Sequence, residues 1–280
     1  MKRGIIFDMD GTLLNSDKQI SPETLNAIKR AGDAGKTVIL CTGRNLAELN
    51  AFTEIIPGLR YLDCVSGACV YDLKEKKTLY SQALDPGIVK KLMEFALEEE
   101  AMIHVLSERS IVQRDQQSHM ADFHMGIYQT MFDKITDKLE NIYNSFCQEP
   151  FPVLKLNLYH KDEYSRARTV ERIKAAGLET ALALAESTSL ECSAKGIDKG
   201  VGLKKLCEHL GLPLEQTIAV GDADNDTMAL KTAGLSIAMG NATEPIKALA
   251  DVIVADCDHN GCAEAIDKYL LAENRPQKPV

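Results

Sequence analysis

Short apolar runs that each end in a polar residue are the feature that most limits how this chain can fold. Residues 4–7 form the first run and lead into Asp8, and residues 37–41 form the second and lead into Thr42. Residues 61–65 form a third run, and the segments between the runs have the spacing of amphipathic helices. Alternation of this kind predicts an α/β fold with a parallel sheet that helices cover.

The middle of the chain follows a different pattern. Residues 83–189 alternate helix-like with strand-like segments, and we expect them to form an inserted α+β domain. Within this stretch, residues 116–148 are predicted to be polar, mixed helical segments. Residues 153–159 alternate apolar with polar side chains, which is typical of a half-exposed strand.

The first pattern returns near residue 190. An apolar run at residues 217–221 again leads directly into an acidic residue, Asp222. We therefore predict a discontinuous, Rossmann-like core made of residues 1–82 and 190–280. In open sheets of this kind ligands bind beyond the carboxyl ends of the strands, so the polar residues that follow the runs are candidates for function.

The first of these strand ends carries two carboxylates. Asp8 and Asp10 stand two residues apart in the stretch Asp-Met-Asp-Gly-Thr, so on an extended chain both side chains face the same way. Two carboxylates in one site can divide into a nucleophile and a proton donor when their environments differ. The alternative is structural, with Asp10 and Gly11 in an ordinary turn and Asp8 as a cap.

A second acidic cluster follows the run at residues 217–221. It contains Asp222, Asp224 and Asp226, and such clusters at strand ends usually bind a hard cation through oxygen ligands. Carboxylates that converge from two strand ends would repel one another without a cation. The alternative is a turn rich in Asp and Asn that caps a helix expected to begin near Asp226.

Two further segments offer groups that bind anions. Thr42 and Gly43 precede an expected helix, so a hydroxyl group and N-terminal backbone amides are available there. Lys199 lies in the stretch Gly-Ile-Asp-Lys-Gly and would add a positive charge. Taken alone, Lys199 is the weaker signal, because most lysines are simply solvated at the surface.

These segments, in this order, carry a family resemblance. The succession D-x-D-G-T-L, a threonine at a strand end, K-G and G-D-x-x-N-D resembles the haloacid dehalogenase superfamily of phosphohydrolases. The long insert, the Thr42-Gly43-Arg44 loop and the stretch Met-Gly-Asn-Ala at residues 239–242 are similar to its Cof-type branch, which has a type-IIB α/β cap. The resemblance covers the whole chain.

The resemblance implies a mechanism and a set of metal ligands. Asp8 would be the nucleophile that forms an aspartyl-phosphate, and Asp10 would protonate the leaving alkoxide and then activate water. Asp8, the backbone carbonyl of Asp10, and Asp222 would hold Mg²⁺. Asp226 would either be a further metal ligand or orient a water on the metal.

The resemblance also implies which residues bind the phosphoryl oxygens. Thr42, the backbone amide of Gly43 and Lys199 would clamp them, with Lys199 neutralising charge. Asn225 would orient Lys199 or the phosphate.

One loop departs from the family pattern. Ser66-Gly67-Ala68 stands where these proteins usually have Asn-Gly-Ala. Family loops at this point lie near the boundary between core and cap, so the difference bears on substrate contacts. It leaves the expected catalytic residues unchanged.

Composition excludes several other classes of protein. The chain has 32 Lys and Arg against 41 Asp and Glu, a net charge of −9, which disfavours a nonspecific binder of nucleic acid or anionic membranes. No stretch approaches the ~20 apolar residues that a membrane span needs. The 8 cysteines form no Cys-x-x-Cys pair, which favours reduced thiols in a cytoplasmic protein over disulfides or a zinc site.

The sequence therefore predicts a cytoplasmic, Mg²⁺-dependent phosphatase whose partner is a small phosphorylated metabolite, such as a sugar phosphate or a nucleotide-like compound. One alternative is a phosphotransferase similar to the phosphomannomutases, which needs the same nucleophile. Another is a sensor that binds a phosphorylated ligand without catalysis. The sequence leaves open the substrate and the choice between monomer and homodimer.

Overall fold

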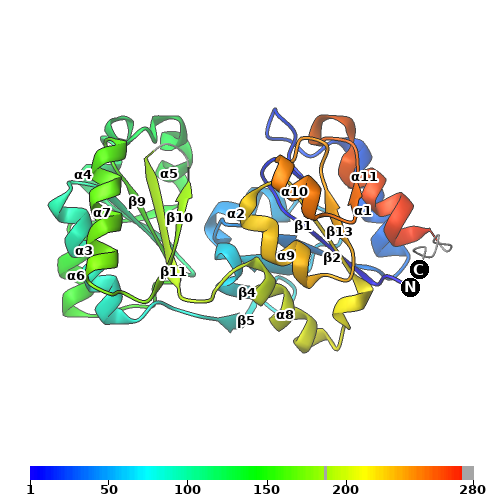
Figure 1. Ribbon diagram of the computed structural model, residues 1–280, viewed down its shortest axis with the longest axis horizontal. Helices are drawn as coiled ribbons and strands as arrows, with labels where there is room; N and C mark the ends of the chain where they lie inside the picture. The colour runs from blue at the N-terminus through cyan, green and yellow to red at the C-terminus, as the bar shows by residue number, and fades with distance from the viewer. Residues whose placement is uncertain (186–187, 273–280) are drawn as a thin grey trace. The chain divides into compact units, whose positions relative to one another are not determined.

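The computed structural model describes residues 1–185 and 188–272, and the chain divides into two compact units (Figure 1). Residues 1–43, 51–80 and 198–280 form the first unit, and residues 44–50 and 81–197 form the second. The predicted insert, 83–189, stops before the end of the second unit, because the strand at Ser189–Ala194 pairs with the strand at Lys155–Tyr159. The segment 44–50, which we expected in the core, is grouped with the second unit.

The first unit is built on an eight-stranded sheet with the strand order β14-β13-β12-β1-β2-β3-β4-β5. The strands from β14 to β3 are mutually parallel, and β4 runs antiparallel to β3. This confirms the predicted α/β class with a parallel sheet. The strands of this sheet are β1 (Gly4–Phe7), β2 (Thr37–Cys41), β3 (Tyr61–Cys64), β4 (Cys69–Asp72), β5 (Lys77–Ser81), β12 (Thr217–Gly221), β13 (Ser236–Ala238) and β14 (Val252–Ile253).

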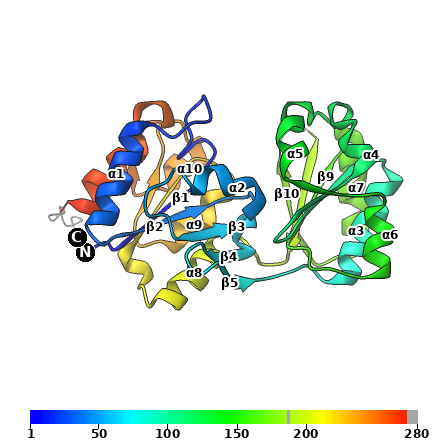
Figure 2. The same ribbon diagram turned by 180° about the vertical axis from the view of Figure 1, so that it is seen from behind.

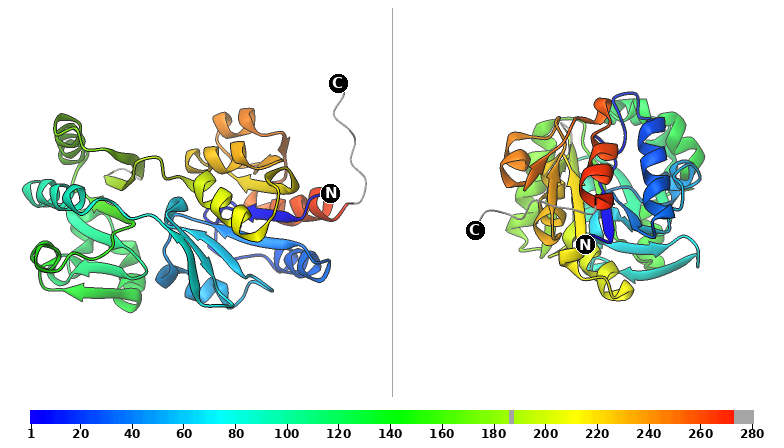
Figure 3. Two further views of the ribbon diagram at one scale, coloured as in Figure 1. Left: turned by 90° about the horizontal axis from the view of Figure 1, so that it is seen from below. Right: turned by 90° about the vertical axis from the view of Figure 1, so that its right-hand side faces the viewer.

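Helices pack against one another in two groups in this unit (Figures 1 and 3). In one group α1 contacts α11, and in the other α8 contacts α9. The first helix begins at Pro22, because the hydroxyl of Ser21 accepts the backbone N–H of Thr24 and proline suits the first helical position. The helices are α1 (Pro22–Asp33), α2 (Leu46–Thr53, which crosses the division between the units), α8 (Lys199–Leu210), α9 (Thr227–Thr232), α10 (Glu244–Leu249) and α11 (Gly261–Ala265), followed by a π-helical turn, Ile266–Leu271.

The register of the central strands places three loop starts at one edge of the sheet. Phe7, the last residue of β1, stands beside Val220 of β12 and Leu40 of β2. Because the three strands are parallel neighbours, the residues that follow them emerge at the same edge. These residues are Asp8, Thr42 and Asp222.

The second unit contains a six-stranded sheet with the order β10-β11-β9-β6-β7-β8 (Figure 2). One face of this sheet packs against α3, α6 and α7 through a shared apolar core. Its elements are α3 (Pro86–Glu98), β6 (Met102–Leu106), β7 (Ser110–Gln113), α4 (Arg114–Gln117), α5 (Gln129–Ile135), β8 (Thr136–Leu139), α6 (Ile142–Gln148), β9 (Lys155–Tyr159), α7 (Glu163–Ala175), β10 (Thr180–Ala185) and β11 (Ser189–Ala194). Across residues 1–185 and 188–272, no helix combines the length and apolar character needed to cross a membrane.

Two predictions for this unit were wrong. The strand β9 is buried along its whole length rather than half exposed, because it lies between β6 and β11 and both of its faces are covered. The polar segment 116–148, predicted to be helical, contains the strand β8. That strand lies at the edge of the sheet and its four residues are only partly buried, so its composition resembles that of a surface segment.

The loop after β3 gives a test of how tightly the first unit is packed. Gly67 has a φ of +94°, and a Cβ there would lie 1.9 Å from the carbonyl oxygen of Asp198. We expect Gly67→Ala to lower the free energy of unfolding by more than ~3 kcal/mol in denaturant unfolding, because steric overlap adds to the cost of a positive φ. Gly58→Ala is the matched control, since Gly58 also has a positive φ but has no atom within 4 Å of the Cβ position. It should lose only about 1 kcal/mol, and equal losses in the two variants would contradict the close packing at Gly67.

Candidate active site

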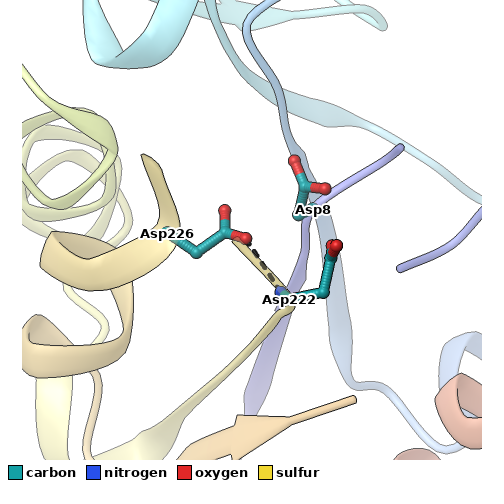
Figure 4. A group of neighbouring side chains, drawn as sticks. All are labelled: Asp8, Asp222 and Asp226. Carbon is teal, nitrogen blue, oxygen red and sulfur yellow. Dashed lines mark hydrogen bonds between the residues drawn. The ribbon is translucent and has the colours of Figure 1, made fainter. Parts of the chain in front are cut away.

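Two acidic turns meet at the carboxyl edge of the first unit's sheet. Asp8 follows β1 and Asp222 follows β12, and these strands are parallel neighbours. One carboxylate oxygen from each of Asp8, Asp222 and Asp226 lies within 4.8 Å of the other two (Figure 4). The structure thus brings together three of the acidic residues that the sequence analysis singles out.

Lys199 completes this group. Its Nζ lies 2.6 Å from Oδ1 of Asp8 and 2.6 Å from Oδ1 of Asp226, and the side chain is only 1% exposed. The lysine begins α8, which Asp198 caps by accepting the backbone N–H groups of Gly200 and Val201. Burial alone would lower the pKa of Lys199, but the two carboxylates outweigh burial and raise the pKa well above its usual value. The lysine is therefore a permanent cation in the site.

The protonation of Asp8 depends on its neighbours. Burial raises the pKa of Asp8 to about 7, Lys199 opposes this rise, and the charges of Asp226 and Asp222 add to it. Burial likewise raises the pKa of Asp222, while a hydrogen bond from Thr12 lowers it. One lysine is thus too little positive charge to keep this set of acids fully ionised at neutral pH.

Asp226 organises the second acidic turn. Its Oδ2 accepts the backbone N–H of Asp222 at 2.9 Å, drawn as a dashed line in Figure 4, and that of Ala223 at 3.1 Å. The turn can close this tightly because residue 221 is glycine, where a Cβ would lie 2.6 Å from the Asp226 carboxyl group. Both carboxylate oxygens of Asp226 are therefore engaged, one by the turn and one by Lys199.

The donor set fits a hard divalent cation. Carboxylate oxygens are the ligands that Mg²⁺ prefers, and three of them converge here against a single lysine. A cation would also favour the ionised form of Asp8 over the protonated form. Of the three acids, Asp8 and Asp222 have oxygens beyond those used by Lys199 and Thr12.

The residues expected to bind phosphate are placed differently from one another. Thr42 is buried at the end of β2, where its backbone N–H donates to the carbonyl of Asp63 at 2.8 Å. Gly43 follows it and is partly exposed. Asn225 is exposed in the acidic turn, and the hydrogen bonds described for Lys199 go to Asp8 and Asp226 instead.

Asp10 stands apart from the three clustered carboxylates. Its side chain is 41% exposed, and its Oδ1 accepts a bond from Lys18 at 3.1 Å. A carboxyl in this position is directly accessible to solvent, whereas Asp8 is buried. Asp8 and Asp10 therefore differ in environment, since Asp8 is buried against Lys199 and Asp10 is partly exposed beside Lys18.

Sequence reasoning missed two residues that support the site. The hydroxyl of Thr12 donates to Oδ1 of Asp222 at 2.7 Å and so links the two acidic turns. The amide of Asn241 donates to the carbonyl of Gly11 at 2.7 Å and accepts the backbone N–H of Cys257. Both residues lie in stretches that carry the family resemblance, which is the signal that could have found them.

Comparison with known proteins identifies relatives along the whole chain. A family model described as haloacid dehalogenase-like hydrolase matches residues 5–266. An HMP-PP phosphatase of Enterobacter sp. (strain 638) is 27% identical, and the match covers 100% of both chains. The chloroplastic endoribonuclease YBEY of Arabidopsis thaliana is 30% identical over 95% of this chain, but the chain spans only 46% of that protein.

A solved structure agrees with the fold. A haloacid dehalogenase-like hydrolase from Bacteroides thetaiotaomicron superposes with a TM-score of 0.83 at 26% identity. The superposition covers 96% of this chain and 99% of the other. Both units of the chain are thus shared with this relative.

The buried lysine yields a prediction about stability. Lys199→Met leaves the carboxylates of Asp8 and Asp226 buried without their cation, so we expect a loss of about 3–5 kcal/mol in metal-free denaturant unfolding. Added Mg²⁺ should recover part of this loss. Lys205→Met is the matched control on the same helix, because Lys205 is partly exposed and its ion pair with Glu208 lies at the surface. A loss in Lys199→Met no larger than the control's would show that the buried network contributes nothing to stability.

The raised pKa of Asp8 yields a second prediction, about pH. In the wild type, the stability that this carboxyl contributes is present below pH about 4 and is lost as the pH rises to about 7. The free energy of unfolding of Asp8→Asn relative to wild type should therefore increase over the same interval, measured by denaturant unfolding in a chelator. Asp224→Asn, an exposed acid of the neighbouring turn, is expected to match the wild type. A difference between Asp8→Asn and wild type that does not change with pH would contradict the raised pKa.

Proposed function

Because the chain belongs to the haloacid dehalogenase-like hydrolases, we propose that it is a Mg²⁺-dependent phosphatase of small phosphorylated metabolites. One observation carries the proposal: the buried carboxylate of Asp8 accepts a hydrogen bond from Lys199 and lies beside Asp222 and Asp226 at the carboxyl edge of the sheet. A nucleophilic carboxylate, a fixed cation and further acids are what phosphoryl transfer through a covalent intermediate requires. The HMP-PP phosphatase that covers the whole chain supports the same class of substrate.

The first chemical step is attack by Asp8. One of its carboxylate oxygens bonds to phosphorus while the bond from phosphorus to the ester oxygen breaks, which gives an aspartyl-phosphate and an alkoxide. Asp10 donates its proton to the alkoxide, and the alcohol leaves. The partial exposure of Asp10 suits this role, because the residue must exchange its proton within each turnover.

The second step returns the enzyme to its starting state. Asp10 now takes a proton from a water molecule, and the water oxygen bonds to phosphorus. The bond between phosphorus and the Asp8 oxygen breaks, which releases inorganic phosphate and restores the Asp8 carboxylate. Asp10 is left protonated, as it was before the first step.

We assign the metal to Asp8, Asp222 and the backbone carbonyl of Asp10. Mg²⁺, when bound, offsets the negative charge of the phosphoryl group during transfer. Asp226, left open above between ligand and orienting residue, is proposed to position Lys199 and the Asp222 turn. Its two oxygens already accept bonds from Lys199 and from two backbone amides, which supports this assignment.

The phosphoryl oxygens are proposed to be bound by Thr42, the amide of Gly43 and Lys199. Thr42 follows β2, the strand next to β1, so it emerges at the same sheet edge as Asp8. Asn225 is proposed to contact the phosphate and not to orient Lys199, because Asn225 is exposed and Lys199 is already held by two carboxylates.

The inserted unit is proposed to be the cap domain of the family, with bounds of 81–197 in place of the 83–189 expected from sequence. The cytoplasm is the proposed location, which the presence of 8 free cysteines supports. Transfer to water rather than to a sugar is the proposed reaction. Release of labelled phosphate into water, with no labelled sugar phosphate when acceptors are added, would separate the phosphatase from a phosphotransferase.

A panel of phosphorylated metabolites and an aryl phosphate tests the function. We expect hydrolysis with Mg²⁺ that a chelator abolishes, because the acids of the site need the cation. Asp8→Asn should reduce turnover to background, since it removes the nucleophile, and Asp10→Asn should reduce kcat by about 10²–10⁴-fold. Asp224→Asn is the control and should retain wild-type activity. Undiminished turnover in Asp8→Asn, or no hydrolysis of any compound, would contradict the proposed function.

A further inference from the structure

A carboxyl group lies inside the apolar core of the first unit, close to the site but with no role assigned above. Asp63 belongs to β3, and its side chain is 0% exposed. It stands in register with Cys41 of β2, which belongs to an apolar cluster with Ile39 and Leu203. A buried carboxyl costs far more free energy than an apolar side chain at such a position, so its presence needs an explanation.

The two oxygens of this carboxyl are bonded unequally. Oδ2 accepts the thiol of Cys41 at 3.1 Å, while Oδ1 has no hydrogen-bond partner in the described part of the chain. Oδ1 fits there because residue 202, in the first turn of α8, is glycine: a Cβ would lie 2.0 Å from it. The free oxygen can therefore gain a proton while the bond to Cys41 is kept.

Asp63 is connected to both sides of the proposed phosphate site. Its backbone carbonyl accepts the N–H of Thr42 at 2.8 Å, and its side chain accepts the thiol of Cys41, the residue before Thr42. The helix turn that it faces at Gly202 begins with Lys199. Asp63 thus contacts both the end of β2 and the first turn of α8.

The groups around Asp63 set its charge. Cys41 faces it from β2, Asp198 and Lys199 from the start of α8, and Cys64 lies beside it on β3. Burial raises the pKa of Asp63 to about 7, the bond from Cys41 and the charge of Lys199 lower it, and Asp198 raises it. Because such coupling is reciprocal, an anion that offsets the charge of Lys199 favours the protonated form of Asp63.

We propose that Asp63 is a positioning residue of the phosphate site, which holds the end of β2 and takes up a proton from solvent when a phosphate dianion binds beside Lys199. The inference rests on the proposed function, since it takes Lys199 and Thr42 as phosphate ligands. The neutral form of Asp63 adds no negative charge behind Lys199, so it is the form that favours the dianion. The expected kinetic sign is a fall in kcat/KM of about twofold to tenfold as the pH rises through about 7.

Proton uptake tests this directly. Sulfate is a suitable probe, because it is tetrahedral and remains a dianion throughout this pH range. Calorimetric titration of the Mg²⁺-loaded protein with sulfate at pH 7, in two buffers of different ionisation enthalpy, counts the protons bound. Wild type should take up as much as about half a proton more per sulfate than Asp63→Asn. Asp8 is present in both proteins, so its own titration cancels in the difference.

Two further variants keep the result interpretable. Asp63→Ala removes the carboxyl without adding an amide donor, and it should show the same reduced proton uptake as Asp63→Asn. It replaces Asp63→Asn in the experiment if the asparagine variant does not fold. Asp72→Asn is the matched control, because Asp72 is also a buried acid of this sheet but pairs with Arg60. It should keep both the wild-type proton uptake and the wild-type pH profile of kcat/KM. If Asp63 had only a structural role, its replacement would change neither the proton uptake nor the pH profile.

The outcomes separate this inference from the proposed function. Equal proton uptake by wild type and Asp63→Asn, or no sulfate binding at all, overturns the inference even if metabolites are hydrolysed. A difference in uptake without hydrolysis of any compound supports the coupling at Asp63 while the phosphatase proposal fails. In the absence of ligands, the free energy of unfolding of Asp63→Asn relative to wild type should also rise from pH about 4 to about 7. A difference in free energy of unfolding that stays constant over this pH range also overturns the inference.

Discussion

The bonds from Lys199 to two buried carboxylates are the interaction on which the site depends. A buried ammonium group without such partners loses its charge, and buried carboxylates without the ammonium gain protons. Lys199 joins the end of β1, through Asp8, to the turn after β12, through Asp226. Three segments that are distant in the chain therefore have to be correctly placed before any one of them carries the charge that phosphoryl transfer requires.

Close backbone approaches make this placement possible. The parallel register of β1, β2 and β12 brings their following loops to one edge, but the loops must also pass one another without side chains between them. Gly221 leaves room for the Asp226 carboxyl, and Gly67 leaves room for the carbonyl of Asp198, the residue before Lys199. These two glycines thus determine how closely the ammonium group of Lys199 approaches the carboxylates. The hydrogen bond from Thr12 to Asp222 then links the two acidic turns.

The sequence predicted the elements whose evidence is local and failed where the evidence is in the tertiary structure. Asp8, Thr42 and Asp222 follow apolar runs, so their place at strand ends could be read directly, and Lys199 entered through the order of motifs. Asp63 could not be found in this way, because an acid within an apolar run gives no sign of which thiol or glycine will face it across the sheet. The error at β9 has the same origin: alternation shows that one face is polar, but not that neighbouring segments bury that face.

The two raised carboxyl pKa values place opposite proton movements at the same sheet edge. Burial holds the pKa of both Asp8 and Asp63 near 7, so each is only partly ionised in the unliganded protein at neutral pH. A divalent cation favours ionised Asp8 and releases a proton, whereas a phosphate dianion beside Lys199 favours protonated Asp63 and takes one up. When both ligands bind, the two movements offset each other, and the net charge brought into the core stays small. Two acids that each make the fold less stable at neutral pH would therefore make the affinity for the metal and phosphate together less dependent on pH than the affinity for either alone.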